Sequence, residues 1–295
     1  MTSKRAVLVT GASRGLGLET ALTLAARGFH VFGGLRNMAD APRVCDCAQS
    51  RSVHVDIVPL DVTDPATVTA AVDAVVGASG HIYGVVNNAA MTLRGYFEDL
   101  DERDIRRILE VNLFGTMNVT RAALPHMRRA GQGRLIMMSS VGGRIGSMAL
   151  TAYVASKFGI EGFSESLSLE LAPLGIRVVI VEPGIIETDI WHTNRRIAAR
   201  AQDASSPYYR WFTRAEEQAD ALVKTSRIRP AHVAATIADA LTVARPRLRY
   251  TVGRRASIVM SLRRHLPGEL FERLYFGEVI RRVTGRRSVS GAREA

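Results

Sequence analysis

Short hydrophobic runs alternate with longer amphipathic stretches along the first 190 residues. The runs are rich in β-branched residues and show no polar alternation, which is typical of strands buried on both faces. The stretches between them have helical periodicity, and one opens with the helix-start signal Thr63-Asp64-Pro65. The expected strands are 5–10, 30–35, 53–60, 82–87, 133–139 and 176–181, and the expected helices are 15–27, 63–77, 101–129 and 151–172. This order predicts a doubly wound α/β fold with a parallel sheet.

The remaining residues add a helix at 230–243, a last strand at 248–252, and two helices at 256–266 and 270–283, separated by Pro267-Gly268. No internal repeat or low-complexity linker divides the chain. We therefore expect one doubly wound domain at 1–253 and a basic helical extension and tail at 254–295.

Composition narrows the class of protein. With 47% hydrophobic and 23% charged residues the chain can form a large core, so disorder is excluded as its main state. No run approaches the ~18–20 apolar residues of a membrane span, and the N-terminus lacks the pattern of a secretory signal. Cys45 and Cys47 are too close for a comfortable disulfide and have no metal-type partners nearby. A cytoplasmic location fits best.

The net charge of +11 raises the question of a nucleic-acid or membrane partner. Residues 245–295 contain thirteen arginines and four glutamates, so this segment alone accounts for +9. No zinc finger or similar motif is present, and we expect no nucleic-acid partner. The apolar and arginine residues of 256–283 fit a peripheral membrane contact. They fit equally well two helices that pack on their own domain and expose their arginines.

A glycine-rich turn follows the first expected strand. Gly11, Gly15 and Gly17 have the spacing G-x-x-x-G-x-G between a strand and a helix. Glycines there permit a tight turn and let backbone N–H groups approach a pyrophosphate at a helix N-terminus. Glycines can also simply end a strand, but their position between a strand and a helix favours dinucleotide binding.

The residues at the end of the second expected strand indicate whether the dinucleotide is NAD or NADP(H). An acidic residue there would bind the ribose hydroxyls of NAD, but this chain has Leu35-Arg36-Asn37. Arg36, with Arg14 in the glycine turn, could bind a 2′-phosphate, which favours NADP(H). The alternative is that both arginines are solvated surface groups. Asp61 could accept a hydrogen bond from adenine, or could equally cap the following helix.

Tyr153 and Lys157 lie four residues apart in an expected helix and therefore share one face. A nearby ammonium lowers the pKa of a phenol, which would let Tyr153 act as a proton donor or acceptor near neutral pH. Alone, such a pair is common on helix surfaces. Here Ser140 lies thirteen residues upstream, just past a strand, where its hydroxyl could bind the same substrate oxygen.

These features together resemble the short-chain dehydrogenase/reductase family, in its NADP-preferring branch. The resemblance covers residues 5–190 and rests on seven motifs in order: TGASRGLG at 10–17, Asp61, NNAA at 87–90, Asn112 in VNLFG, SSVGG at 139–143, YVASK at 153–157 and PGIIET at 183–188. One departure is Ala90, where the family usually has glycine. Residues 230–283 look like the carboxyl-terminal part of retinol- and hydroxysteroid-dehydrogenase-like members.

The resemblance implies a role for each matching residue. Tyr153 would be the acid/base, Lys157 would lower its pKa and bind the nicotinamide ribose, and Ser140 would orient the substrate oxygen. Asn112 would hold a water of the proton relay, or would be a hydrogen-bonded polar residue that kinks its helix. The residues expected to bind NADP(H) are Gly11, Ser13, Arg14, Gly15, Leu16, Gly17, Arg36, Asp61, Val62, Asn88, Ala89, Tyr153, Lys157, Pro183, Gly184, Ile186 and Thr188.

The resulting prediction is an NADP(H)-dependent oxidoreductase that moves a hydride between nicotinamide C4 and a lipophilic, steroid- or retinoid-like alcohol or ketone. The resemblance implies a Rossmann-type NADP-binding catalytic domain at 1–253, in which 189–229 is a substrate flap. The aromatic residues of this flap suggest such a pocket, although ordinary packing would explain them nearly as well. The alternatives are a reductase of a smaller polar or acyl-carrier-linked ketone, and a non-catalytic NADP-binding regulator. The resemblance also suggests a homodimer or homotetramer built on the helices at 101–129 and 151–172.

Overall fold

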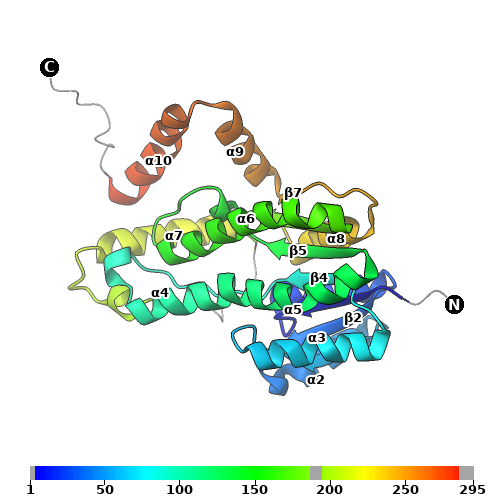
Figure 1. The fold of residues 1–295 in the computed structure, drawn as a ribbon. Coiled ribbons are helices and arrows are strands. Elements are labelled where there is room, and N and C mark those ends of the chain that lie inside the picture. Colours follow the sequence, from blue (N-terminus) through cyan, green and yellow to red (C-terminus); the bar gives the residue numbers. More distant parts are fainter. Residues whose placement is uncertain (1–3, 187–194, 286–295) are drawn as a thin grey trace.

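Seven parallel strands form one sheet with helices on both faces (Figure 1). The structure, a computed structural model, describes residues 4–186 and 195–285. The strand order is β3-β2-β1-β4-β5-β6-β7, and all six neighbouring pairs are parallel. The strands are β1 Ala6–Thr10, β2 His30–Leu35, β3 Asp56–Pro59, β4 Gly84–Asn87, β5 Gly133–Met138, β6 Ile176–Pro183 and β7 Arg249–Val252. The prediction of a doubly wound α/β fold is confirmed.

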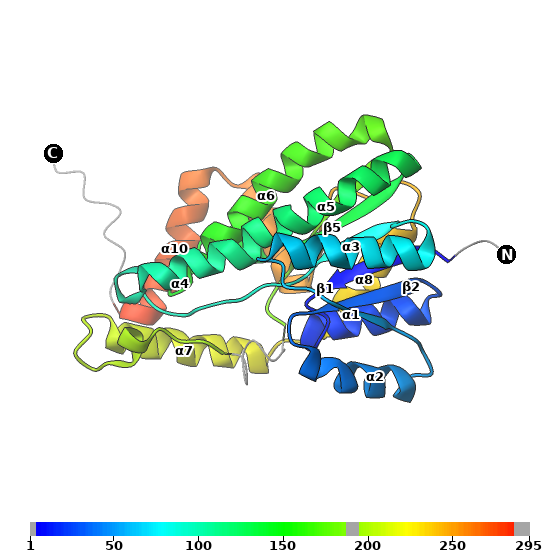
Figure 2. The same cartoon turned by 60° about the horizontal axis from the view of Figure 1, so that its bottom comes forward.

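Alternate residues of each strand face opposite layers of helices. In β1, Val7 and Val9 belong to the core under α1, α2 and α8, whereas Ala6 and Leu8 belong to the core under α3, α5 and α6 (Figure 2). All four side chains are fully buried, which explains why the strands appear in the sequence as continuous apolar runs. The helices are α1 Gly15–Ala26, α2 Ala41–Ser50, α3 Pro65–Ser79, α4 Glu102–Leu109, α5 Gly115–Ala130, α6 Thr151–Leu171, α7 Tyr209–Lys224, α8 Pro230–Thr242, α9 Arg254–His265 and α10 Gly268–Thr284.

The chain reverses its direction of progress across the sheet between β1 and β4. In such sheets, ligands bind at the carboxyl ends of the strands beside this reversal. The glycine loop follows β1, the segment 87–90 follows β4, and the serine pair follows β5. The topology therefore places all three motifs at one edge of the sheet.

The prediction of one continuous helix at 101–129 is wrong. A π-helical turn, Glu110–Phe114, separates α4 from α5. Two contacts are made at this turn. The Asn112 side chain forms hydrogen bonds with the backbone of Met91. Gly115 packs closely on Val62, so that a Cβ atom on Gly115 would lie 2.5 Å from Val62 Cγ2. Helical hydrogen bonding continues on both sides of the turn, so helical periodicity alone did not reveal the break.

Three other segments also differ from expectation. Only Asp56–Pro59 of the expected strand at 53–60 pairs with β2. Helix α2, which carries both cysteines, was not predicted, because it is short and buries only Val44 and Ala48. Helix α7 was not predicted either, although the aromatic residues at its start were noted.

The last two helices form a hairpin beside α7 and β7 (Figure 1). Ala256 of α9 and Phe271 and Val283 of α10 are buried, so the hairpin packs on the rest of the chain. In the part of the chain that the structure describes, no helix combines the length and apolar character needed to cross a bilayer.

Candidate active site

The end of β4 holds the glycine loop through hydrogen bonds. Thr10 Oγ1 accepts from the backbone N–H groups of Asn88 at 3.0 Å and Ala89 at 2.9 Å. The Asn88 amide donates in return to the carbonyl oxygens of Thr10 at 2.9 Å and Gly11 at 3.2 Å. The two loops on either side of the β1–β4 reversal are therefore fixed to each other. Thr10 was not among the predicted site residues, although it opens the first motif.

The three glycines of the loop are needed for different reasons. Gly11 and Gly15 have positive φ angles of 65° and 55°, which L-residues with side chains rarely adopt. A Cβ atom on Gly17 would overlap the carbonyl oxygen of Gly11 and lie 2.5 Å from the Asn88 amide nitrogen. A Cβ atom on Gly15 would project into open space. The loop thus packs tightly on one side and leaves the other side open.

The open side fits the pyrophosphate of a dinucleotide. Helix α1 begins at Gly15, and the residue before it, Arg14, forms no side-chain cap to the first N–H groups. Uncapped N–H groups and the helix dipole favour a bound anion. Ser13 lies half-buried in the loop, and the half-buried Leu16 packs on the core below.

The adenosine end contains both cations that the sequence pointed to. Arg36 is exposed immediately after β2, and Arg14 forms an ion pair with Asp40 at 3.1 Å. Asp61 Oδ1 accepts from the N–H of Thr63 at 2.9 Å and from its hydroxyl at 2.7 Å, so Asp61 holds the turn before α3. The cap of α3 itself is Asp64, so the alternative that Asp61 caps the helix is wrong. Partial burial opposes its ionisation, but these hydrogen bonds and the charge of Arg36 keep the pKa of Asp61 below its ordinary value. The buried Val62 follows it.

Strand β5 and helix α6 bring Ser140, Tyr153 and Lys157 together. Ser140 and Tyr153 lie on either side of Gly142, where a Cβ atom would be 3.6 Å from both Ser140 Oγ and Tyr153 Cε1. Ser140 Oγ accepts from the N–H of Gly142 at 3.1 Å. Lys157 is only 2% exposed, and its Nζ donates to the Met138 carbonyl at 2.7 Å. The same Nζ lies 5.7 Å from the centroid of the Tyr153 ring. Two hydroxyls that could bind one substrate oxygen therefore lie beside a buried cation.

The pKa values of this group correct one expectation. Burial raises the pKa of Tyr153, and the hydrogen bond with Ser140 offsets only part of that effect. Burial also lowers the pKa of Lys157 to about 8, against the opposite effect of Glu161. The Tyr153 pKa is thus raised overall rather than lowered as predicted, because desolvation of the phenol outweighs the interactions that favour the phenolate.

Asn112 connects the loop after β4 to the catalytic helix. Its Oδ1 accepts from the Met91 N–H at 2.8 Å, and its Nδ2 donates to the Met91 carbonyl and to Ser156 Oγ, both at 2.9 Å. The Ser156 hydroxyl donates in turn to the Tyr153 carbonyl at 2.6 Å. Ser156 was overlooked in the sequence, although it lies inside the YVASK motif.

The expected nicotinamide segment begins at the end of β6. Pro183 is the last residue of that strand, and the N–H of Gly184 donates to the Val252 carbonyl at 3.0 Å. Ile186 is 7% exposed and belongs to the core. Thr188 lies outside the described residues.

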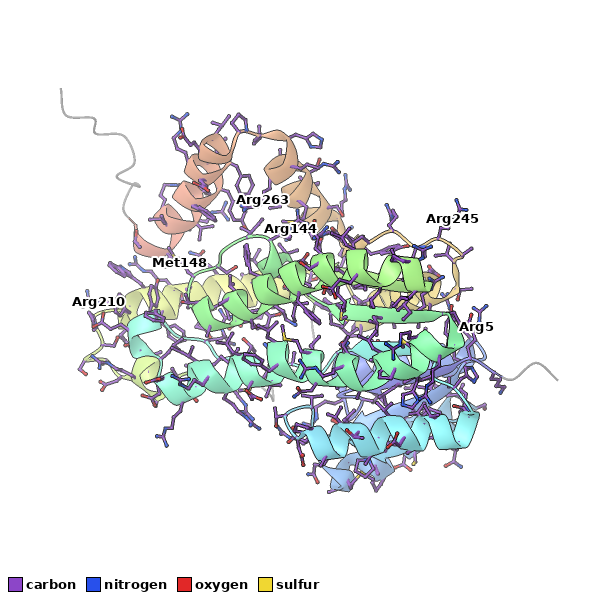
Figure 3. The ribbon with its side chains drawn as sticks, in the orientation of Figure 1. Arg5, Arg144, Met148, Arg210, Arg245 and Arg263 are labelled. Atoms are coloured by element: carbon purple, nitrogen blue, oxygen red, sulfur yellow. The ribbon has the colours of Figure 1, made fainter. Side chains whose placement is uncertain are left out.

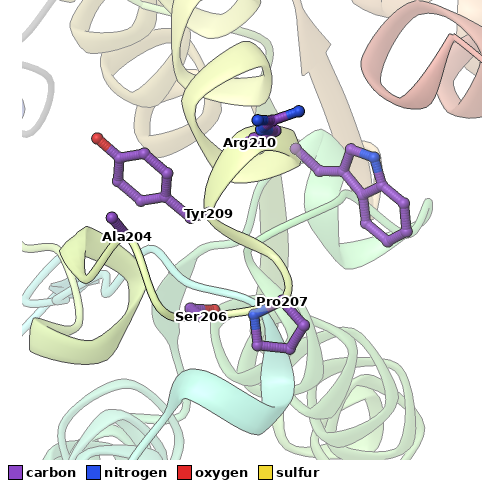
Figure 4. A pocket seen from close by; sticks show the side chains of 6 residues that line it. Ala204, Ser206, Pro207, Tyr209 and Arg210 are labelled. Atoms are coloured by element: carbon purple, nitrogen blue, oxygen red, sulfur yellow. The ribbon is translucent and has the colours of Figure 1, made fainter.

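An aromatic cluster lies at the N-terminal end of α7. The rings of Tyr96 and Tyr208 stack with centroids 4.9 Å apart, and Trp211 contacts both. A shallow hollow of about 540 Å³ next to this cluster is lined by Ala204, Ser206, Pro207, Tyr209, Arg210 and Trp211 (Figure 4). None of Ser140, Tyr153 and Lys157 lines this hollow, so it is not the site of the chemistry.

The sequence is similar to known oxidoreductases. A relative from Escherichia coli K12, the uncharacterized oxidoreductase YbbO, is 31% identical over 275 residues, covering 93% of this chain and 95% of that protein. The 3-alpha-(or 20-beta)-hydroxysteroid dehydrogenase of Mycobacterium tuberculosis is 40% identical over 188 residues, covering 62% of this chain and 70% of the relative.

Solved structures share the fold over nearly the whole chain. A short-chain dehydrogenase from Streptomyces avermitilis has a TM-score of 0.78 at 32% identity, covering 95% of this chain and 98% of its own. The actinorhodin polyketide ketoreductase with NADPH has a TM-score of 0.73 at 30% identity, covering 85% of this chain and 97% of its own. A short-chain dehydrogenase/reductase from Burkholderia phymatum in complex with NAD has a TM-score of 0.77 at 22% identity, covering 90% of this chain and 95% of that one. At this low identity, the similarity is evidence for the shared fold only.

The family itself is identified by a sequence profile for short chain dehydrogenases, which matches residues 5–198. That range contains the glycine loop, Asn112, Ser140, Tyr153 and Lys157. Its relatives are oxidoreductases, and the fold and the grouping of side chains agree with the profile. The chain belongs to the short-chain dehydrogenase family and is an oxidoreductase acting on CH–OH groups with a nicotinamide cofactor.

Proposed function

We propose that the protein is an NADP(H)-dependent dehydrogenase or reductase of a lipophilic alcohol or ketone, related to the hydroxysteroid- and retinol-dehydrogenase-like members of its family. What carries this proposal is the grouping of the Ser140 hydroxyl and the Tyr153 phenol beside the buried ammonium of Lys157. A complete set of this kind argues against a non-catalytic regulator.

Each of these side chains has a separate part in the proposed chemistry. The phenol of Tyr153 gives a proton to the carbonyl oxygen during reduction, or takes one during oxidation. The Ser140 hydroxyl donates a hydrogen bond to the same oxygen and stabilises its developing charge. The Lys157 ammonium favours the phenolate that remains. NADP(H), when bound along the glycine loop, supplies or accepts the hydride.

The NADP(H) preference rests on Arg36 and Arg14 at the adenosine end. We expect Arg36→Asp to weaken NADPH binding at least about tenfold, because a charged hydrogen bond is lost and a repulsive carboxylate takes its place. NADH binding should change little. Kd values for both cofactors, measured by isothermal titration calorimetry, check this expectation.

Arg43→Asp makes the same charge change at an exposed position of α2 and is the matched control. If Arg36→Asp weakens NADPH and NADH binding equally, or if Arg43→Asp gives the same selectivity change, the assignment of Arg36 to the 2′-phosphate is wrong.

The lipophilic substrate class rests on two aromatic groups. Tyr96, Tyr208 and Trp211 form the first, and Phe271, Tyr275 and Phe276 of α10 form the second. Helix α10 packs against α7. We propose that the α9–α10 hairpin covers the substrate side of the enzyme rather than binding a membrane, since its buried residues already pack on the chain.

Trp211→Ala tests the substrate class directly. We expect the KM for a steroid ketone to rise about tenfold, because an indole contributes more than 1 kcal/mol of apolar contact. The KM for cyclohexanone should stay nearly the same, since that ring is too small to reach the cluster. Steady-state kinetics with NADPH measure both values.

Phe97→Ala removes an exposed ring from the segment next to Tyr96 and should leave both KM values unchanged. An equal rise for the two ketones in Trp211→Ala would mean that the cluster is packing and not a substrate wall.

A second candidate is the reduction of an acyl-carrier-linked ketone. The similarity to the actinorhodin polyketide ketoreductase favours it. A β-ketoacyl thioester included in the same kinetic panel separates the two, since it should be the better substrate only under this second reading.

A further inference from the structure

A network of polar and charged side chains around two buried carboxylates, Glu161 and Glu182, lies next to the catalytic lysine and has no part in the chemistry proposed above. It comes from four segments: helix α6, strand β6, strand β7 and the loop between β5 and α6. Its members are Arg144, Glu161, Glu165, Glu182, Arg249 and Thr251.

Arg249 of β7 is the centre of this group. Its Nε donates to Glu161 Oε2 at 3.0 Å, and its Nη2 donates to Glu165 Oε2 at 3.0 Å. Glu182 Oε1 lies 3.6 Å from the same Nε. The guanidinium thus bridges three carboxylates, two of them on the catalytic helix.

Glu182 of β6 has its own partners. Its Oε1 accepts from Arg144 at 3.0 Å, and its Oε2 accepts from the Thr251 hydroxyl at 2.7 Å. Arg144, labelled in Figure 3, comes from the loop that follows Ser140. Both carboxylate oxygens of Glu182 therefore have hydrogen-bond donors of their own, Arg144 and Thr251.

Glu161 is the member next to the catalytic lysine. It lies one helical turn after Lys157 on α6, so the two side chains share a face. Its side chain is 7% exposed, and Oε1 is buried without a hydrogen-bond partner among the described residues. A Cβ atom on Gly143 would lie 3.1 Å from Glu161 Cγ and 3.1 Å from the Lys157 carbonyl, so this loop closes the space around both residues.

A half-satisfied buried carboxylate costs stability, so its presence calls for a compensating role. We propose that Glu161 is a positioning residue that keeps the buried Lys157 ammonium charged, and that Arg249 keeps Glu161 ionised. This inference rests on the proposed function only in taking Lys157 as the cation that serves Tyr153.

The charges around Glu161 set the direction of the effect. The groups around Glu161 are Lys157 and Glu165 on α6, Ser139 directly after β5, Glu182 on β6 and Arg249 on β7. Burial raises the pKa of Glu161 and Glu182 adds to the rise, while hydrogen bonds with Ser139 and Arg249 oppose it. Glu161 in turn raises the pKa of Lys157, which burial has lowered to about 8. Removal of the Glu161 charge should therefore lower the Lys157 pKa further.

The composition of the chain makes this value directly measurable. The sequence has only three lysines, Lys4, Lys157 and Lys224. In protein labelled with ¹³C and ¹⁵N at lysine, NMR titration can follow each side chain without substrate or cofactor, and Lys157 is assigned by comparison with Lys4→Arg and Lys224→Arg. We expect Glu161→Gln to lower the Lys157 pKa by about one unit or more.

Two matched variants separate charge from packing. Glu165→Gln removes a carboxylate that binds the same Arg249 but lies exposed one turn further along, and should leave the Lys157 titration unchanged. Glu161→Asp keeps the charge and should restore most of the wild-type value. If Glu161→Gln does not fold, Arg249→Gln tests the same network, because loss of that guanidinium should neutralise Glu161 and again lower the Lys157 pKa.

Activity gives a second readout. If ketone reduction requires the ammonium, the alkaline limb of its kcat/KM profile should move to lower pH in Glu161→Gln and stay in place in Glu165→Gln. A Lys157 pKa that is the same in wild type and Glu161→Gln overturns the inference. Because the titration needs no substrate, it remains decisive even if none of the tested ketones is reduced, which would count against the proposed function alone.

Discussion

Tyr153→Phe should reduce kcat for ketone reduction by about 10²–10⁴-fold, the contribution of a positioned general acid. The phenol lies beside both Ser140 and the Lys157 ammonium, the position from which the proposed proton transfer to the substrate oxygen takes place. Phenylalanine keeps the ring and its packing. Single-turnover kinetics with NADPH, together with the Kd for NADPH, measure the loss and show whether cofactor binding survives.

Tyr83→Phe is the matched control for this experiment. Tyr83 is a buried tyrosine whose hydroxyl donates to the Leu241 carbonyl at 2.9 Å, away from the catalytic residues. Its loss should cost about 1 kcal/mol of stability without changing kcat. Full activity in a Tyr153→Phe protein that still binds NADPH would overturn the assignment of the proton donor.

The topology of the sheet could be predicted because its strands are buried on both faces. Runs such as Ala6–Thr10 and Ile176–Pro183 carry no polar alternation, and only a parallel sheet between two helical layers buries strands in that way. The break at Glu110–Phe114 could not be predicted by the same means. It accompanies the contact of Asn112 with Met91, twenty-one positions away in sequence, and such a partner leaves no periodic signal.

The family resemblance also indicated which side chains meet near the catalytic helix. It pointed to Ser140, which the structure places beside Tyr153, while the preceding Ser139 lies close to Glu161. It did not predict the direction of the Tyr153 pKa shift, because that depends on burial and on where the Lys157 ammonium donates its hydrogen bond. The spacing indicated that the Lys157 ammonium could reach the Tyr153 phenol, but in the structure this ammonium donates its hydrogen bond to the Met138 carbonyl.

The basic C-terminal segment was the least predictable part. Its thirteen arginines look alike in sequence, and the count suggested a membrane or partner surface. Arg249 differs from the others because β7 places it against α6, 88 positions from Glu161. Only the strand order β5-β6-β7 brings that guanidinium behind the catalytic lysine.

Gly17→Ala should weaken NADPH binding by about 10–100-fold. The added methyl group would overlap the Gly11 carbonyl oxygen, which is backbone, and would lie 2.5 Å from the Asn88 amide nitrogen. Either the glycine loop or the end of β4 must move. Overpacking of this kind costs about 1–3 kcal/mol, and the same two loops are proposed to hold the cofactor. The Kd for NADPH, measured by quenching of tryptophan fluorescence or by calorimetry, gives the size of the effect.

Gly77→Ala is the matched control, since a Cβ atom at that position of α3 meets nothing within 4 Å and alanine favours a helix. It should leave the Kd unchanged and raise the thermal midpoint slightly. In Gly17→Ala the midpoint of the protein without cofactor should fall by only a few degrees, because the strain is local. Unchanged NADPH affinity in Gly17→Ala would mean that the cofactor does not depend on the close contact between the glycine loop and Asn88.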